Sequence, residues 1–404
     1  MLDEPTMTGT NGGAQFFDAL GDVQSDSLLA LIALANADPR PDKIDVGVGV
    51  YRDGAGNTPI LRAVKAAEKL LWESQQSKSY IGGFGDKRYT ELLRPIVLGR
   101  HADDDRIAGL HTPGGCGALS LGFKLIATAH PGSKVLVGTP TWPNHIPVIE
   151  AAGLSIAEYG YYDRLQSRIR FEEMLAAFEQ AGTGDVVLLH GCCHNPTGAD
   201  LNEGQWREIV DVVARRGLIP LVDIAYQGLG RGFAEDAAGL HLLLDACDEV
   251  VVAQSCDKNF GVYRDRVGSL LLKTRSADQT KRAMNHAVQI AREMWSMPPD
   301  HGAATVRIVL DTPELRADWD AEVGEMRDRI NRIRGAIAGA DPRLAYIGSQ
   351  FGMFSMLPVS QQQVRQLRED HGIYMADSGR FNVIGMADHA VDRFIEAVVG
   401  AMNG

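Results

Sequence analysis

Short apolar runs alternate with longer stretches of helical periodicity through the middle of the chain. The candidate strands are residues 135–137, 186–189, 218–222, 250–252 and 268–272. Apolar runs of this length, bounded by polar or turn residues, are typical of buried strands. Because they alternate with helical patterns, they indicate a mostly parallel sheet covered by helices. We therefore predict an α/β fold for the large central part of the chain.

The N-terminal stretch follows a different pattern. Residues 1–24 are polar and glycine-containing apart from Phe16 and Phe17, which predicts a loosely held arm or one that packs on a neighbour. Ser27 is expected to cap a short apolar helix. Residues 44–51 then form a glycine-interrupted strand or extended segment.

A long helix is expected near residue 312, with Thr312 as its N-cap and Pro313 in its first turn. Its early residues are acidic and its late ones basic, which suits the helix dipole. Beyond it, residues 351–357 and 381–384 are candidate strands of a smaller α+β unit. The long helix would then join two domains.

These patterns lead to a division of the chain into domains. We expect an N-terminal arm over residues 1–24 and the first part of a small domain over 25–58. A large domain over 59–324 would follow, and residues 325–404 would complete the small domain.

Composition narrows the class of protein. The 404 residues can bury large cores, and a hydrophobic content of 45% with 23% charged residues is ordinary for a soluble protein. The formal net charge of -12 argues against a general nucleic-acid binder. The start lacks a signal peptide, and the apolar residues 28–35 are too few to cross a bilayer. The five cysteines form no disulfide framework, so a reducing cytoplasm is expected.

Four predicted strands deliver polar or aromatic residues just beyond their carboxyl ends. These residues are Trp142, Asn195, Asp223 and Lys258. Ligands of open α/β sheets bind at this edge, so four such residues in one sheet indicate a shared cleft.

Lys258 and Asp223 carry the most chemistry. An amine in a partly dehydrated cleft can bond covalently to a carbonyl, although a solvated loop lysine is the ordinary alternative. Asp223 ends a wholly apolar strand, where an isolated charge is very costly and a carboxylate is normally paired. A helix N-cap is the alternative for Asp223.

Two further segments were weighed as ligand sites. Residues 112–119 place glycines before a helical run, where backbone N–H groups can seat a phosphate. The segment lacks a P-loop lysine and follows no clear strand, so on its own it would be an ordinary turn. In residues 190–198, the adjacent Cys192 and Cys193 lack the spacing of a zinc motif, and we expect no metal.

Residues Lys258-Asn259-Phe260-Gly261 with Arg266-Val267-Gly268 resemble the cofactor-lysine segment of class I, fold-type I aminotransferases that use pyridoxal phosphate (PLP). More narrowly, they resemble the aspartate and aromatic amino-acid subgroup. The similarity extends from residues 44–51 to residues 378–383. It implies a large domain with a mostly parallel, helix-covered sheet and a smaller α+β domain.

The resemblance implies specific roles around the cofactor ring. Lys258 would hold PLP covalently and serve as general base and acid, and Asp223 would pair with the protonated pyridine nitrogen. Tyr226 and Asn195 would form hydrogen bonds with the phenolic oxygen of the cofactor ring. Trp142 would stack on the ring. A lone histidine is more often structural, but His145 matches one that supports the aspartate.

It also implies a phosphate site and a substrate site. The phosphate residues would be Gly114, Gly115, Cys116, Ser255 and Arg266, with Tyr80 reaching in from the other subunit. The substrate residues would be Gly49, Trp142, Asn195, Arg292 and Arg380. Arg380 would clamp the α-carboxylate. Arg292 would cross the dimer interface to bind a side-chain carboxylate, although a flanking arginine usually extends to solvent.

The sequence departs from the family pattern at some of these positions. Cys116 stands where Thr or Ser is usual, and Asp257 stands where Ser is usual, so phosphate affinity is expected to be lower. Met294, Trp295 and Met297 make the surroundings of Arg292 more apolar and adaptable, so aromatic side chains are also expected to fit.

The expected function is PLP-dependent transamination of aspartate, aromatic amino acids or both with 2-oxoglutarate, by ping-pong chemistry through pyridoxamine phosphate. The expected protein is a cytoplasmic homodimer with shared active sites that binds amino acids and 2-oxo acids, and neither nucleic acid nor membrane. A PLP lyase or decarboxylase on the same fold is the enzymatic alternative. A PLP-domain regulator would need a DNA-binding module, of which the N-terminal arm has no sign. The preferred donor stays open at this stage.

Overall fold

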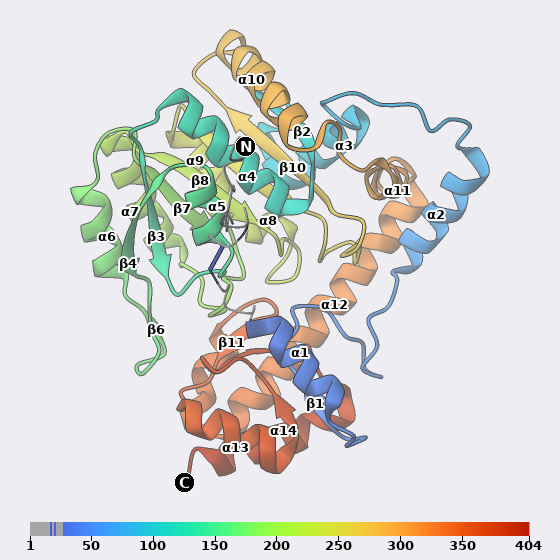
Figure 1. Cartoon of the computed structure of the whole chain (residues 1–404), viewed down its shortest axis with the longest axis vertical. Coiled ribbons are helices and arrows are strands. Elements are labelled where there is room, and N and C mark those ends of the chain that lie inside the picture. The colour runs from blue at the N-terminus through green and yellow to red at the C-terminus, as the bar shows by residue number, and fades with distance from the viewer. Residues whose placement is uncertain (1–16, 18–19, 22–26, 404) are drawn as a thin grey trace, which may run out of the picture.

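A computed structural model describes residues 17, 20–21 and 27–403. The expected arm over residues 1–24 therefore lies almost wholly outside the described residues. Helix α1 (Ser27–Ala37) begins where a helix was expected, but the side chain of Ser27, its expected cap, lies outside them too. Figure 1 shows a large sheet with its helices above and a smaller unit below, joined by the long helix α12 (Pro313–Ala340).

The large sheet has seven strands in the described part of the chain. In spatial order they are β2 (Ile107–Pro113), β10 (Val267–Lys273), β9 (Val250–Ser255), β8 (Ile219–Ile224), β7 (Val186–His190), β3 (Lys134–Thr139) and β4 (Ser155–Gly160). Strand β10 is antiparallel to both of its neighbours, and the pairs β9–β8, β8–β7, β7–β3 and β3–β4 are parallel. The mostly parallel sheet is confirmed.

All five apolar runs are strands of this sheet, namely β3, β7, β8, β9 and β10. The two strands that the pattern missed, β2 and β4, are the edges of the sheet. An edge strand needs less apolar sequence than a central one, because it has a neighbour on one side only. The expectation that residues 112–119 follow no clear strand was wrong, since they come directly at the end of β2.

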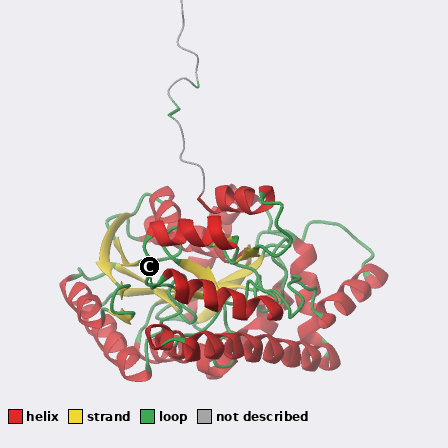
Figure 2. Cartoon of the chain, turned by 90° about the horizontal axis from the view of Figure 1, so that it is seen from below, coloured by secondary structure: helices red, strands yellow, loops and turns green. Residues whose placement is uncertain are grey.

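Helices cover both faces of the sheet, as the yellow strands between red helices show in Figure 2. Successive residues of a strand point to opposite faces. In β7, Val187 and Leu189 belong to one core and Val186 and Leu188 to the other. The helices of this unit are α2 (Arg62–Ser74), α3 (Lys87–Leu98), α4 (Gly114–Ala129), α5 (His145–Ala151), α6 (Phe171–Gln180), α7 (Glu203–Arg216), α8 (Phe233–Asp236), α9 (Ala238–Ala246), α10 (Ala277–Trp295) and α11 (Asp300–Asp311).

The smaller unit is built from segments far apart in the sequence. Strand β1 (Ile44–Asp45) pairs in parallel with β12 (Ile373–Tyr374), and β11 (Phe354–Met356) pairs antiparallel with β13 (Arg380–Asn382). Helices α1, α13 (Gln361–His371) and α14 (Val391–Ala401) pack with them (Figure 1). The domain boundaries at 25–58, 59–324 and 325–404 remain our proposal.

Two local expectations are met only in part. Of the strand or extended segment expected over 44–51, only Ile44 and Asp45 are β-structure, and the Asn382 side chain holds the rest by donating to the carbonyls of Val48 and Val50, each at 2.7 Å. Thr312 stands at the N-cap of α12, but its side chain makes no capping hydrogen bond.

A hairpin of β5 (Tyr162–Asp163) and β6 (Arg168–Ile169) leaves the large sheet beside β4 and extends toward the smaller unit (Figure 1). Within the described ranges, no helix combines the length and the apolar character needed to span a bilayer.

Candidate active site

A cleft forms at the carboxyl ends of β3, β7, β8 and β9, where the sequence predicted it. It has a volume of about 560 Å³, part of it open to solvent. Its walls are Gly115, Cys116, Leu119, Trp142, His190, Cys192, Asn195, Asp223, Ala225, Tyr226, Ser255, Asp257, Lys258 and Arg266. The structure therefore brings together nine of the residues that the sequence assigned to the cofactor site.

Lys258 presents its amine to this cleft. The Lys258 Nζ lies 3.9 Å from the Asp257 Oδ2 and 5.4 Å from the centre of the Tyr226 ring, and 20% of the side chain is exposed. Burial lowers the pKa of Lys258, and the carboxylates of Asp257 and Asp223 only partly oppose this effect. A lowered pKa increases the neutral fraction of the amine, which is the form that attacks a carbonyl.

Asp223, on the neighbouring strand β8, is held as a carboxylate in the same cleft. Its Oδ2 lies 3.0 Å from the Nε2 of His145, whose side chain is fully buried. Burial alone would raise the pKa of Asp223, but the hydrogen bond and charge of His145, with Lys258 further off, lower it overall. The Oγ1 of Thr141 lies 2.7 Å from the Nδ1 of His145, which fixes the ring from behind. His145 therefore lies behind Asp223 and does not line the cleft.

Asn195 and Tyr226 converge on one point of the cleft. The Asn195 Nδ2 lies 3.4 Å from the Tyr226 hydroxyl oxygen. The buried Asn195 Oδ1 has no hydrogen-bond partner among the described residues. Asp200 fixes the loop before Asn195, because its two oxygens accept from the backbone N–H groups of Cys193 and His194 at 2.8 and 2.9 Å. An unsatisfied buried amide oxygen is costly, so this point is suited to a polar ligand.

The end of β2 and the start of α4 form a cradle of backbone. Gly114 has φ +69°, and a Cβ there would lie 2.5 Å from an Arg266 nitrogen; one on Gly115 would lie 3.0 Å from the Ser255 Cβ. Only glycine allows these approaches. The first N–H groups of α4 have no partner within the helix and lie at its positive end, so together with Ser255 and Arg266 they could bind a phosphate.

Two departures from the family pattern alter this cradle. The Arg266 Nη1 donates to the Asp257 Oδ2, and also to the Tyr263 carbonyl at 3.1 Å. The other oxygen of Asp257 is buried without a hydrogen-bond partner among the described residues. Cys116 places its Sγ 3.3 Å from the Asn144 Nδ2, and burial raises the pKa of its thiol. A phosphate would therefore share Arg266 with an existing carboxylate.

We expect Asp257→Ser to bind PLP about tenfold more tightly, because it removes a negative charge beside the phosphate cradle. Equilibrium dialysis of the apoprotein measures the dissociation constant, with Asp265→Ser as a matched control outside the cleft. Pyridoxal, which lacks the phosphate, should show a much smaller gain than PLP. An equal gain for both would contradict competition at Arg266.

The remaining predicted residues lie outside the cleft walls. Arg380 lies on β13, where its Nη2 donates to the Gly47 carbonyl at 2.6 Å and its guanidinium carbon lies 4.9 Å from the Phe354 ring centre. Gly49 packs on the same ring, since a Cβ there would lie 2.8 Å from it. Arg292 near the end of α10 and Tyr80 before α3 are exposed, Tyr80 at 90%. This single chain does not bring them to the cleft.

Sequence reasoning missed Phe354. Its ring meets Tyr226 edge-on with centres 6.0 Å apart, and the Arg380 guanidinium carbon lies 4.9 Å from its centre. It therefore connects the two units beside the cleft. An aromatic residue in a short apolar strand carries no signal that distinguishes it from ordinary core.

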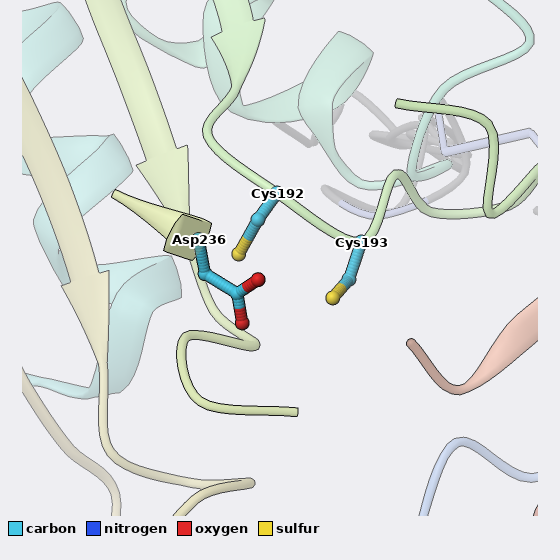
Figure 3. A group of neighbouring side chains, drawn as sticks. All are labelled: Cys192, Cys193 and Asp236. Atoms are coloured by element: carbon cyan, nitrogen blue, oxygen red, sulfur yellow. The ribbon is translucent and has the colours of Figure 1, made fainter. Parts of the chain in front are cut away.

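Cys192, Cys193 and Asp236 form the closest group of potential metal ligands among the described residues (Figure 3), with ligand atoms within 4.8 Å of one another. Both oxygens of Asp236 already accept backbone N–H groups, from Gly228, Gly230 and Arg231. The hydrogen bond with Cys192, together with burial, raises the pKa of Cys193 well above its ordinary value. A protonated thiol and an occupied carboxylate are poor ligands, so we interpret the group as structural.

Comparison with known proteins identifies the family. Residues 41–398 match the model of the family described as aminotransferase class I and II. The tyrosine aminotransferase of Rhizobium meliloti (strain 1021) is 50% identical over 374 residues, which are 92% of this chain and 96% of that protein. The aspartate aminotransferase of Salmonella typhi is 40% identical over 395 residues, or 96% of this chain and 100% of that protein.

A solved structure agrees. The aromatic-amino-acid aminotransferase of Burkholderia pseudomallei, described as covalently bound to pyridoxal phosphate, superimposes with a TM-score of 0.93 at 38% identity, covering 96% of this chain and 100% of that one. The chain therefore belongs to the class I and II aminotransferase family and is a fold-type I, PLP-dependent aminotransferase.

Proposed function

We propose that the cleft holds PLP and that Lys258 is its covalent anchor. The observation that carries this proposal is the meeting of an amine of lowered pKa, a buried carboxylate and a phosphate cradle in one cleft. The cofactor fits the residues present. The unpartnered Asn195 Oδ1 would gain a polar neighbour, and Gly114 and Gly115 let Arg266 and Ser255 approach the backbone N–H groups that could bind the phosphate.

The residues of the chain would divide the work as follows. When bound, PLP supplies an electron sink for the bonds at the substrate Cα. The Lys258 Nζ accepts the proton from the substrate Cα as a general base and gives it back in the following step as a general acid. Asp223, held by His145, would keep a negative charge in the cleft, and Tyr226 and Asn195 would together hold one oxygen of the ring. Trp142 covers the ring and excludes water.

Arg380 is proposed to bind the α-carboxylate of the substrate. It lies beside the cleft, where its guanidinium carbon is 4.9 Å from the centre of the Phe354 ring, which meets the Tyr226 ring edge-on. Burial raises the pKa of Tyr226 overall, and the charge of Arg380 opposes that rise only in part. A guanidinium binds a carboxylate through two parallel hydrogen bonds. Amino acids and 2-oxo acids both carry this group, so one arginine serves both halves of the reaction.

The substrates proposed are aspartate and aromatic amino acids, with 2-oxoglutarate as the acceptor. Relatives named tyrosine aminotransferase and aspartate aminotransferase match almost the whole chain. Arg292 offers a charge for a second carboxylate, whereas the partly buried Met294, Trp295 and Met297 offer apolar surface to an aromatic ring.

Replacement of Arg292 should affect the reaction of aspartate much more than the reaction of aromatic amino acids. We expect Arg292→Leu to lower kcat/KM for aspartate by about 100-fold, because the second carboxylate loses its partner, and to change phenylalanine by less than about threefold. Stopped-flow rates of the half-reaction for each donor measure this, with Arg282→Leu on the same helix as control. Equal losses for both donors would count against the role of Arg292.

We further propose a homodimer in which Tyr80 and Arg292 of one subunit complete the site of the other. The stretch around Tyr80 exposes large apolar side chains, with Ile60 at 55%, Trp72 at 80% and Ile81 at 39% exposed. Such side chains on a soluble chain indicate a covered surface. Sedimentation equilibrium tests the dimer. A cytoplasmic location is proposed because all five cysteines are free thiols.

A half-reaction tests the function directly. With amino acid alone and no oxo acid, each site should release one oxo acid and convert one PLP to pyridoxamine phosphate, then stop until 2-oxoglutarate is added. A lyase or decarboxylase would instead turn over repeatedly without an acceptor. We favour transamination, in agreement with the relatives named above.

A further inference from the structure

Arg164 connects the large unit by hydrogen bonds to the segment that carries Arg380. It lies in the turn of the β5–β6 hairpin, and its two terminal nitrogens donate to two carbonyls of the smaller unit. Nη1 reaches the Ser378 carbonyl at 2.7 Å and Nη2 reaches the Val359 carbonyl at 2.9 Å. Within the described ranges Arg164 forms no ion pair, so these two bonds hold its guanidinium.

The turn itself presents Arg164 in a fixed place. Asp163 accepts from the backbone N–H groups of Leu165 and Gln166, each at 3.0 Å, which closes the turn around Arg164. Next to Asp163, Tyr162 of β5 pairs with Ile169 of β6. The guanidinium is therefore delivered by a locally ordered hairpin that extends toward the smaller unit (Figure 1).

The two carbonyls that it binds flank the strand pair β11–β13. Met356, the last residue of β11, pairs with Arg380, the first residue of β13. Ser378 lies two residues before Arg380, and Gly379 lies between them with φ +82°. The Gly379 carbonyl accepts a hydrogen bond from the Leu357 N–H at 2.9 Å. The turn is tight, because a Cβ on Gly379 would lie 2.7 Å from the Leu357 oxygen. A shift of Ser378 therefore moves the start of β13.

We propose that Arg164 is a positioning residue that holds Arg380 at the mouth of the cleft by fixing Ser378 and Val359 to the large unit. The inference rests on the proposed role of Arg380. Because the amino acid and the 2-oxo acid would share that arginine, Arg164 influences the binding of both. Neither Arg164 nor the two residues that it binds, Ser378 and Val359, line the cofactor cleft.

A second, buried pair of hydrogen bonds would keep the hairpin bound to the smaller unit without Arg164. Gln350 Nε2 donates to the Tyr162 hydroxyl at 3.1 Å, and Ser355 Oγ donates to Gln350 Oε1 at 2.6 Å. Ser355 lies on β11. Removal of Arg164 should therefore loosen the mouth of the cleft without separating the units.

The test is Arg164→Met in the holoenzyme, with Arg168→Met as the matched control. Arg168 lies on the same hairpin, is exposed, and donates from Nε to Gln166 within the hairpin. We expect Arg164→Met to raise KM for aspartate and for 2-oxoglutarate by the same factor, about tenfold, with kcat changed less than about threefold. The Kd for PLP should not change. Arg164→Lys should restore part of the loss, because one ammonium can reach one of the two carbonyls.

Each of the following results would decide against the proposal. A lower melting temperature with unchanged KM values, or a change in only one of the two KM values, would overturn it. In an Arg380→Ala background, Arg164→Met should add no further loss in single-turnover rates, and an added loss would also overturn it. If Arg380→Ala itself leaves both KM values unchanged, the role of Arg380 fails first and this inference falls with it. If Arg380→Ala raises both KM values and Arg164→Met does not, only the positioning role fails.

Discussion

Replacement of Lys258 by alanine is expected to lower turnover by about 10⁴-fold or more, because in the proposed function this one side chain would supply both the covalent anchor and the acid–base group. The structure gives the reason for choosing this amine. It lies at the end of β9, is 20% exposed, and burial lowers its pKa. An ordinary solvated lysine is mostly protonated at neutral pH, so only a small fraction of it is in the form that attacks a carbonyl.

The measurement combines turnover with the site of attachment. Borohydride reduction of the wild-type holoenzyme should fix the cofactor to the peptide that contains Lys258, and mass spectrometry should find no such adduct in Lys258→Ala. Lys134→Ala serves as the control, because Lys134 is exposed at the amino end of β3, whereas the cleft lies at the carboxyl ends of the strands. Unchanged absorption of bound cofactor and unchanged turnover in Lys258→Ala would refute the assignment.

The sequence was sufficient to place Lys258, Asp223, Asn195 and Trp142 in one cleft. Each follows an apolar run long enough to be recognised as a central strand, and the parallel strands of one sheet share an edge at which their carboxyl ends meet. In such a sheet, the apolar run of each strand is enough to predict that the residues after it lie near those after the other strands. The same logic failed at β2 and β4, because edge strands carry mixed polar and apolar residues.

Contacts between distant segments could not be read from the sequence. Asp257 was expected to add negative charge near a phosphate, but its pairing with Arg266 depends on the turn that lies between them, in which Arg266 has φ +56°. Phe354 beside Tyr226, and Arg164 on the Ser378 carbonyl, join residues more than 100 positions apart. Tyr80 and Arg292 are exposed in the single chain, so their proposed roles need a second subunit.

Replacement of Asp223 by asparagine is expected to lower kcat by about 10³-fold, since asparagine keeps the shape but not the negative charge that would stabilise a protonated ring nitrogen. Binding of the cofactor should persist, because the cradle at Gly114, Ser255 and Arg266 is untouched. His145→Leu is the graded comparison. It removes the 3.0 Å bond to Asp223 but leaves the carboxylate, so its loss should be about tenfold.

The pH dependence distinguishes a charge effect from a packing effect. Because the pKa of Asp223 is lowered, its carboxylate persists at neutral and mildly acidic pH. The stability that this lowered pKa contributes is present at neutral pH and is lost as the pH falls through the folded-state pKa. The ratio of wild-type to Asp223→Asn kcat should therefore stay constant between about pH 6 and pH 9. A ratio that collapses within this range would mean that Asp223 titrates there, and it could not then hold a permanent charge against the ring.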